Sequence, residues 1–467
     1  MKIDLAATLI RWGVYPAMKI LRGNRIMDHL HTLRQTEMLT AEQLTALQAK
    51  KLQQLLEHCN AQVPAYRHRW SADEIVRDPV RCLRQLPLLD KASFRDDPER
   101  YVADDADRSK LIPNRTGGST GEPVRFYMDR HTVEQYEAAR WRGLSWWGIR
   151  PWSRSIMVWG SPIELDRANE ARYRRRELWL KNRMILPAYR LKAEEVGRYV
   201  QLIDRYRPDY LYGYGGALAS LAQLLQQAGD LPHHRVKVVI YTAEGMTAED
   251  RQLVSQVFRA PVAGEYGARD GGILAFECPQ GNLHLTAENV FLEVVDPCTG
   301  EPADTGLILV TDLNNYVQPR LRYVLGDWGA LAPTEERCSC GRGLPLLAAL
   351  EGREDAMFLA ADGSLVHGHL AAHVARETPG VKQIQVVQFQ PDRFQARLVV
   401  EEDIDRNEVA ESITAGLRRW LGDVRVEVEF VPSIAPAASG KYRYAIRQFP
   451  LGDSTAAKSN TDDHTDR

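Results

Sequence analysis

The sequence has little of several features that would mark a specialised class of protein. Its 467 residues include only six cysteines, too few for a disulfide scaffold, which favours the reducing cytoplasm. The 60 Lys and Arg nearly balance the 62 Asp and Glu, whereas a dedicated nucleic-acid-binding protein would be distinctly basic. No run of about 18 apolar residues is present, so no transmembrane segment is expected. The remaining composition, 44% hydrophobic and 26% charged, is that of a globular protein.

The N-terminal segment 1–23 comes nearest to a membrane-active sequence. Asp4, Arg11 and Lys19 interrupt its apolar residues, and a small-residue cleavage site is not evident, which argues against a signal peptide. A weak interfacial helix is one interpretation. We favour the other, a helix packed against the protein's own body.

The chain is longer than one typical hydrophobic core, so two or more domains are expected. We predict an N-terminal helical segment of the large domain over 1–110, an α/β core over 111–352 and a small C-terminal domain over 353–450. The last residues, 451–467, have almost no apolar side chains to bury and are predicted to be disordered.

Strand-like and helix-like patterns alternate through the middle of the chain. Thr40 and Gln43 match a capping box that begins a helix. Further along, β-like runs alternate with helical ones, which predicts an α/β fold with a largely parallel sheet. The strands are expected at 154–160, 236–245 and 260–267, and the helices at 193–206 and 217–229.

The pattern changes after this alternation. Residues 284–313 have turn signals between two β-like runs, which predicts a hairpin. Beyond 353, two strand-like runs flank an amphipathic helical pattern, which predicts a small α+β domain.

A loop rich in glycine, serine and threonine occupies 114–127 and contains Thr116, Gly117, Gly118, Ser119, Thr120 and Gly121. Successive backbone N–H groups in such a loop can form a nest around an anion. The lysine followed by Ser or Thr of a P-loop is missing, because Glu122 and Pro123 stand at the end of the loop. Taken alone, the loop fits phosphate binding and ordinary loop composition about equally.

Four other short stretches carry candidate functional groups: 241–246, 264–272, 320–329 and 436–447. The first two come at predicted strand ends, which is where α/β sheets place their ligands. Each also has an ordinary interpretation when taken alone. Tyr266 fits a core aromatic, Asp327 a turn residue and Lys441 a solvated surface lysine.

Taken in order, these stretches resemble the adenylate-forming ligases, the superfamily of acyl-CoA synthetases and peptide-synthetase adenylation domains. The likeness is strongest to the phenylacetate–CoA ligase-like branch, which includes relatives from capsular-polysaccharide biosynthesis, and it covers nearly the whole chain. The resemblance implies a large N-terminal α/β domain and a small mobile C-terminal α+β domain. It also implies ATP, Mg²⁺ and coenzyme A as partners in the reaction.

The resemblance also implies roles for individual residues. The loop from Thr116 to Gly121 would grip the phosphates of ATP, and Lys441 would contact the carboxylate and the α-phosphate. Around the nucleoside we expect Ala243, Glu244 and Gly245 on the adenine side, Tyr266 and Gly267 framing the adenine, and Asp327 holding the ribose hydroxyls. Gly352, Arg353 and Asp355 match the hinge of the small domain.

One position departs from the family pattern. The family has Ser or Thr and then Glu after Tyr-Gly-x, whereas this chain has Arg269 and Asp270. Asp270 is shorter than Glu but can still bind Mg²⁺, directly or through water. Arg269 either pairs with an acidic acyl substrate or points to solvent.

Three cysteines and one histidine fit a structural zinc site. Cys338 and Cys340 flank a serine before a glycine, and Cys278 and His284 flank another turn. Closed sites with these ligands are structural, and some members of the resembled branch have one. The alternative is four unconnected residues, since free cysteines are commonly just buried.

A tryptophan-rich stretch, 140–152, allows two interpretations as well. Its rings either wall an acyl pocket or pack between a helix and the sheet, and we favour the packing role.

Together these features predict an adenylating enzyme for a small-molecule carboxylic acid, with coenzyme A as the default acyl acceptor. A second hypothesis is acyl transfer to a glycan-linked amine or hydroxyl in surface-polysaccharide assembly. The third is a non-catalytic nucleotide-binding relative, for which Arg269 and Asp270 are the only support in the sequence. The sequence identifies neither the acyl group nor the oligomeric state.

Overall fold

A computed structural model describes most of the chain. The described residues are 8–14, 16–17, 23–116, 124–159, 171–187, 191–333, 335–353, 357–363, 365–434 and 444–449. They form two compact units. The first comprises Met1–Glu293, Leu309–Leu325 and Ala330–Ala349, and the second comprises Val294–Ile308, Gly326–Gly329 and Leu350–Arg467.

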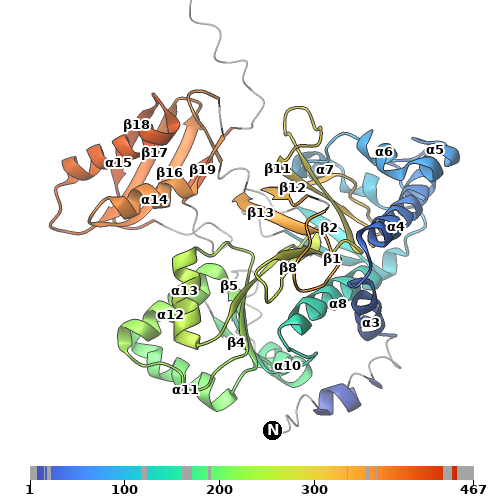
Figure 1. Cartoon of the computed structure of the whole chain (residues 1–467), viewed down its shortest axis with the longest axis horizontal. Coiled ribbons are helices and arrows are strands. Elements are labelled where there is room, and N and C mark those ends of the chain that lie inside the picture. Colours follow the sequence, from blue (N-terminus) through green and yellow to red (C-terminus); the bar gives the residue numbers. More distant parts are fainter. Residues whose placement is uncertain are drawn as a thin grey trace, which may run out of the picture. The chain divides into compact units, whose positions relative to one another are not determined.

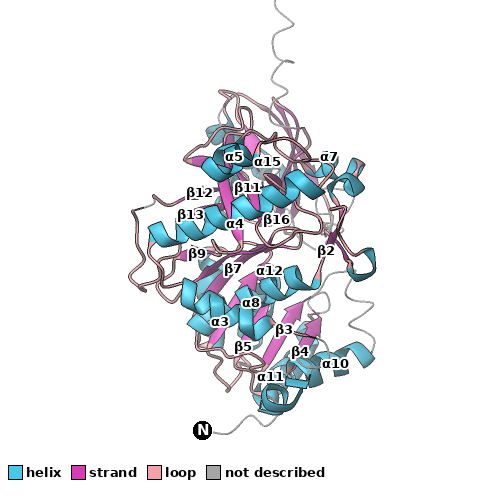
Figure 2. Ribbon diagram, turned by 90° about the vertical axis from the view of Figure 1, so that its right-hand side faces the viewer, coloured by secondary structure: helices cyan, strands magenta, loops and turns pink. Residues whose placement is uncertain are grey.

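An eleven-stranded sheet dominates the fold, with strand order β10-β11-β12-β13-β9-β8-β7-β6-β5-β3-β4. Strands β4, β3, β5, β6 and β7 run parallel, and β8, β9 and β13 continue the sheet antiparallel. Figure 2 shows β3, β4 and β5 side by side. The parallel strands are β3 (Ser155–Trp159), β4 (Arg183–Pro187), β5 (Tyr210–Tyr214), β6 (Val238–Thr242) and β7 (Val262–Ala268). The others are β8 (Gly272–Glu277), β9 (Leu283–Leu285), β10 (Val290–Val295), β11 (Thr305–Asp312), β12 (Tyr323–Leu331) and β13 (Leu346–Arg353). This confirms the predicted α/β fold.

Helices cover the parallel strands on both faces, because these strands are apolar on both sides. Leu211 points into a core under one set of helices, while its neighbours Tyr210 and Tyr212 point into the opposite core, as the two-residue period of a strand requires. The first set is α11 (Val196–Tyr206), α12 (Gly215–Ala228) and α13 (Ala248–Phe258), with the short η5 (Ala193–Glu195) before it (Figure 1). The second set is α3 (Ile26–Thr36) and α8 (Arg130–Trp146). Between β3 and β4 lies α10 (Ala171–Lys181).

Local sequence signals set the ends of several helices. Helix α4 (Ala41–Gln62) begins with the predicted capping box, in which the Thr40 hydroxyl accepts from the Gln43 N–H and the Gln43 side chain accepts from the Thr40 N–H. Helix α12 ends at Gly229, whose φ of +66° is a left-handed conformation that glycine adopts without cost.

The N-terminal helices and a short hairpin complete the first unit. Leucines of α4 form a core with α5, α6 and the segment that follows. The elements here are α5 (Ala72–Arg77), α6 (Pro79–Arg84), α7 (Lys91–Asp96), η2 (Pro98–Tyr101), η3 (Arg108–Lys110), β1 (Ile112–Arg115) and β2 (Arg125–Met128). The tryptophans of α8 pack as expected, since Trp141 and Trp146 are buried in the core between the helix and the sheet.

The second unit contains a separate four-stranded sheet, of order β18-β17-β16-β19. Strands β16 and β17 are antiparallel, and β18 and β19 join them in parallel at the two edges. Its elements are β14 (Met357–Leu359), β15 (Leu365–His367), α14 (His369–Glu377), β16 (Val381–Gln390), β17 (Arg393–Val400), α15 (Arg406–Leu421), β18 (Arg425–Phe430) and β19 (Ala445–Arg447). Apolar residues of α14 and α15 form one core with this sheet, so the small α+β arrangement is confirmed.

The described residues of the N-terminal segment, 8–14 and 16–17, are helical and include η1 (Ile10–Val14). Ile10 is buried as expected for packing against the protein, but Leu9 and Trp12 are exposed. Among the described residues, no helix has both the length and the apolar character needed to cross a bilayer.

The close packing of α8 on the sheet gives a stability prediction. A Cβ atom at Gly143 would lie 2.2 Å from Cγ of the buried Phe276, so Gly143→Ala forces the ring or the helix to move. Overpacking outweighs the helix propensity that alanine brings, and we expect a loss of about 1–2 kcal/mol in the free energy of unfolding, measured with urea.

Gly197→Ala in α11 is the matched control, because the nearest heavy atom to its added Cβ would be 3.9 Å away. This substitution should raise the free energy of unfolding by about 0.5–1 kcal/mol. Equal effects of the two alanines would contradict the packing described for α8.

Candidate active site and candidate metal centre

Two of the predicted nucleotide-binding segments lie at the same edge of the sheet. Strands β6 and β7 are neighbours and run parallel, with Thr242 paired opposite Glu265. The turn from Ala243 to Gly245 follows the end of β6, and Tyr266 and Gly267 lie near the end of β7. Because carboxyl ends of parallel strands meet at one edge, these residues are brought together where α/β sheets bind ligands.

The turn after β6 has an unusual backbone. Ala243 has a φ of +65°, a left-handed conformation that costs a residue with a Cβ about 1–2 kcal/mol. Helix α12, which precedes β6 in the chain, contacts this turn with its first residues. The Gly216 N–H donates to Glu244 Oε2 at 3.1 Å, and a Cβ at Gly215 would lie 2.7 Å from the Gly245 carbonyl oxygen. The Glu244 carboxylate therefore lies at the positive end of the α12 dipole.

A buried polar network, which the sequence did not reveal, anchors the end of β7. The Glu265 side chain is 1% exposed, pairs with Arg140 at 3.1 Å and accepts a hydrogen bond from the Tyr212 hydroxyl at 2.7 Å. The Thr242 hydroxyl also donates to it at 3.3 Å. Burial raises the pKa of Tyr212, so its hydroxyl remains a donor at neutral pH. The one sequence feature that could have indicated this network is Glu265 itself, an acidic residue directly before the Tyr-Gly pair in a predicted strand.

Asp270 is buried and engaged on two sides. Its Oδ2 accepts a hydrogen bond from the Tyr323 hydroxyl at 2.9 Å. Its backbone oxygen accepts from the Arg320 guanidinium through Nε at 3.1 Å and Nη2 at 2.9 Å. These contacts fix the position of the carboxylate and keep the adjacent guanidinium on the backbone oxygen.

The structure describes only some of the remaining predicted site residues. Thr116 closes the base of the glycine-rich loop, because its N–H donates to the Val124 oxygen and its hydroxyl accepts from the Val124 N–H. Asp327 is half-buried in β12 after Gly326, whose φ is +80°. Residues Gly117, Gly118, Ser119, Thr120, Gly121, Asp355 and Lys441 lie outside the described residues, and of Arg353 only the backbone is described.

A cavity of about 400 Å³ lies away from these segments. It is bordered by Val262 at the first residue of β7 and by Trp147, Arg251 and Glu277. Arg251 and Glu277 pair with each other there, so these two charged groups are engaged within the protein.

The four predicted metal ligands come together. Ligand atoms of Cys278, His284, Cys338 and Cys340 all lie within 4.8 Å of one another. Cys278 Sγ is 3.6 Å from Cys338 Sγ, and Cys340 Sγ is 3.3 Å from His284 Nε2. Tetrahedral zinc with Zn–S bonds of about 2.3 Å separates its sulfurs by about 3.8 Å. These spacings suit one tetrahedral ion and are too long for a disulfide.

The loops that hold these ligands share one geometry. Gly281 follows Cys278 by three residues and Gly341 follows Cys338 by three, and both glycines are left-handed, with φ of +85° and +82°. Their N–H groups donate to the carbonyl oxygens of Cys278 and Cys338. In each turn a backbone N–H also points at the sulfur, at 3.4 Å from Gln280 to Cys278 and at 3.5 Å from Cys340 to Cys338.

The protonation states of His284 and Cys338 suit metal binding, whereas burial raises the pKa of Cys278 to about 11. Burial lowers the pKa of His284 to about 4, with Arg342 and Arg142 adding to the effect, so the ring is neutral at pH 7. Its Nδ1 donates to the Leu344 oxygen at 3.4 Å, which leaves Nε2 unprotonated toward Cys340. Burial raises the pKa of Cys338, but the Cys340 N–H and the Asn282 amide outweigh burial and lower it overall.

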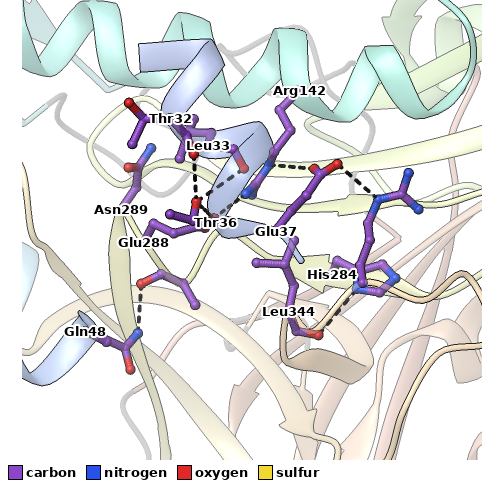
Figure 3. Close-up of polar contacts among 12 residues, drawn as sticks. Thr32, Leu33, Thr36, Glu37, Gln48, Arg142, His284, Glu288, Asn289 and Leu344 are labelled. Carbon is purple, nitrogen blue, oxygen red and sulfur yellow. Dashed lines mark hydrogen bonds and ion pairs between the residues drawn. The ribbon is translucent and has the colours of Figure 1, made fainter. Parts of the chain in front are cut away.

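A buried network of charges lies beside His284, one of the four candidate ligands (Figure 3). The Arg142 side chain, 1% exposed, donates to Glu288 Oε1 at 2.7 Å, and the same oxygen accepts from the Thr36 hydroxyl. Glu37 lies between Arg142 and Arg342, at 4.0 Å and 3.8 Å. These contacts connect α3, α8 and the loop that carries Cys338 and Cys340.

Comparisons with known proteins show what the chain is similar to. The CapK C-terminal domain family matches residues 358–448. Protein CapK of Staphylococcus aureus is 22% identical over 368 residues, which cover 79% of this chain and 80% of CapK. The phenylacetate–coenzyme A ligase of Thermus thermophilus is 26% identical over 343 residues, 69% of this chain and 73% of the ligase.

Solved structures give the same fold. A 2-hydroxyisobutyryl-CoA ligase in the postadenylation state, in complex with 2-HIB-AMP, superimposes with a TM-score of 0.67 at 18% identity, over 89% of this chain and 91% of the ligase. The chain is thus similar to phenylacetate–coenzyme A ligases and to CapK, and it has the fold of the adenylate-forming ligases.

Proposed function

We propose that the protein activates a carboxylic acid with ATP and transfers the acyl group to the thiol of coenzyme A. The observation that carries this proposal is the convergence of the predicted adenine-side segments, Ala243–Gly245 and Tyr266–Gly267, on adjacent carboxyl ends of parallel strands. Similarity to ligases over more than two thirds of the chain supports it. Six free cysteines fit a reaction in the reducing cytoplasm.

In the first half-reaction a carboxylate oxygen attacks the α-phosphorus of ATP. An O–P bond forms, the bond to pyrophosphate breaks, and negative charge builds up on the pentavalent phosphorus. The amides and hydroxyls of the Thr116–Gly121 loop and the Lys441 ammonium would stabilise that charge. In the second half-reaction the coenzyme A thiolate attacks the acyl carbonyl, so that a C–S bond forms and AMP leaves.

Asp270 would hold the Mg²⁺ ion that accompanies ATP. One of its oxygens already accepts the Tyr323 hydroxyl, and the other is the one we expect to face the cation. The ion would neutralise phosphate charge and orient the leaving pyrophosphate. Because the Arg320 guanidinium contacts the backbone oxygen of Asp270, it does not compete for the carboxylate.

A second candidate acceptor is a glycan-linked amine or hydroxyl used in surface-polysaccharide assembly. Residues 358–448 match the CapK C-terminal domain, and the branch that the sequence resembles includes relatives from capsular-polysaccharide biosynthesis, which favours this alternative. A non-catalytic nucleotide-binding protein is the third possibility, and it alone predicts ATP binding without release of pyrophosphate.

We also propose that Cys278, His284, Cys338 and Cys340 bind one structural Zn²⁺ ion. The sulfur spacing, the left-handed glycine turns and the neutral His284 support it. Three thiolates and one Zn²⁺ carry a net charge of about −1. The nearby Arg142 and Arg342 guanidiniums are already paired with Glu288 and Glu37. The ion would fix the loop against Glu37, whose backbone oxygen accepts from the Gly343 N–H at 3.0 Å.

Carboxylate-dependent ATP–pyrophosphate exchange without coenzyme A tests adenylation. We expect exchange with one class among aryl, fatty and hydroxy acids, and Lys441→Ala should reduce it by about 10²–10³-fold because transition-state charge loses its partner. Asp270→Asn should raise the Mg²⁺ concentration needed for half-maximal exchange. Adding coenzyme A should then give a thiol-dependent acyl product.

Lys382→Ala serves as the matched control, since Lys382 is an exposed lysine of the same C-terminal region. Unchanged exchange in Lys441→Ala would refute the assigned role of this lysine. ATP binding without exchange for any acid would favour the non-catalytic alternative, and exchange without a coenzyme A product would favour the glycan-linked acceptor.

Elemental analysis of the purified protein tests the zinc proposal. We expect about one Zn²⁺ per chain, lost on Cys338→Ser or Cys340→Ser with a lower melting temperature, because metal binding is part of the folding free energy. Cys298→Ser is the control and should retain the metal, since Cys298 is exposed and is not one of the four ligands that come together. A metal-free wild-type preparation with an unchanged melting temperature would refute the site.

A further inference from the structure

We propose that η1 and α10 form a docking patch for an anionic lipid surface. The patch consists of Leu9, Trp12, Arg175, Arg176, Trp179 and Leu180. It lies outside the predicted nucleotide site and outside the metal cluster, and the adenylation reaction gives no reason for it.

The apolar part of the patch is highly exposed. Trp12 is 74% exposed, Leu9 64%, Trp179 70% and Leu180 41%. Leaving such large apolar surfaces in water is unfavourable, by roughly 1.5–3 kcal/mol for each side chain that could be fully buried. An exposed group of this kind indicates a surface that is covered when the protein works.

Both elements of the patch are held by the protein body. Ile10 is 3% exposed and seats η1, while its neighbours Leu9 and Trp12 point outward. Helix α10 contacts η1. The two tryptophans therefore come from adjacent elements.

The spacing in α10 places cations and apolar groups on one face. Arg175 and Trp179 are four residues apart, as are Arg176 and Leu180, so the four side chains share one side of the helix. Glu177, the single acid of α10, has a side chain 1% exposed and pairs with Lys181 at 3.0 Å. The outward face thus joins arginines with a tryptophan and a leucine, so that cations for lipid head groups and apolar groups for the boundary below them lie side by side.

The net charge of α10 indicates what kind of surface binds the patch. Helix α10 contains four arginines and one lysine against one glutamate, a net charge of +4, whereas the whole chain has a net charge of −2. The positive charge is therefore local to this helix. Anionic lipid head groups attract such a face, and tryptophan rings favour the boundary between head groups and acyl chains.

A second copy of the chain fits the patch less well. In a two-fold dimer the same surface would meet itself, so that Arg175 and Arg176 would face the arginines of the other copy. A lipid surface instead offers opposite charge together with an apolar layer.

Co-sedimentation with vesicles tests the patch. We expect the full chain to bind phosphatidylcholine vesicles containing about 30% phosphatidylglycerol, and to bind pure phosphatidylcholine at least about tenfold more weakly. Raising NaCl from about 0.1 M to about 0.5 M should weaken the binding. The double variant Arg175→Gln/Arg176→Gln should lose about 30-fold in affinity, at about fivefold for each cation removed.

Trp12→Ser/Trp179→Ser should also abolish binding, and Trp420→Ser is the matched control because Trp420 is 54% exposed on α15, outside the patch. Circular dichroism and melting temperature check that each variant is folded. Binding that is absent from both kinds of vesicle, or equal for the two, overturns the proposal. A concentration-dependent dimer that Trp179→Ser dissociates also overturns it, because the patch would then be a contact between copies.

Discussion

The buried ion pair between Arg142 and Glu288 is the constraint on which the first unit depends. Both side chains are nearly inaccessible to water, at 1% and 2% exposure, and 146 residues separate them in the sequence. Removing either partner of such a pair leaves an uncompensated buried charge, at a cost of about 3–5 kcal/mol. The pair therefore fixes α8 against the segment between β9 and β10, and through Thr36 and Glu37 it fixes the end of α3 as well.

The cysteine and histidine cluster builds on the same constraint. The Trp146 indole donates to Glu37 at 2.9 Å and packs edge-on against the His284 ring at a centroid distance of 5.5 Å. The Arg342 guanidinium lies over the indole at 4.5 Å. Trp146 thus connects the charge network to the candidate metal ligands. This agrees with the packing role that the sequence analysis favoured for the tryptophan-rich stretch.

Patterns local in sequence predicted what local physics determines. The alternation of apolar residues gave β3, β6 and β7, and the Thr40–Gln43 pair gave the start of α4. The turn-borne cysteines predicted the cluster, because short glycine turns set the direction of the thiols through local backbone geometry.

Contacts that depend on three-dimensional packing left no such pattern. Glu265 lies 125 residues from Arg140 and 53 from Tyr212, and no spacing rule connects them. The sequence also did not predict the left-handed backbone at Ala243. A glycine at this position would have indicated a positive φ, whereas alanine rarely adopts one. The network and the strained turn hold neighbouring strand ends at the proposed nucleotide site. Backbone strain and buried charges are commonly found at functional sites.

The proposed lipid-binding patch bears on the choice of acyl acceptor. Coenzyme A and ATP are dissolved in water, and a ligase that joins coenzyme A to a water-soluble acid gains nothing from a membrane surface. An acceptor anchored in a lipid bilayer would be met only at that surface, where docking through Trp12 and Trp179 raises its effective concentration. Vesicle binding would therefore shift the balance from coenzyme A toward a lipid-anchored glycan, although the two acceptors require the same adenylation chemistry.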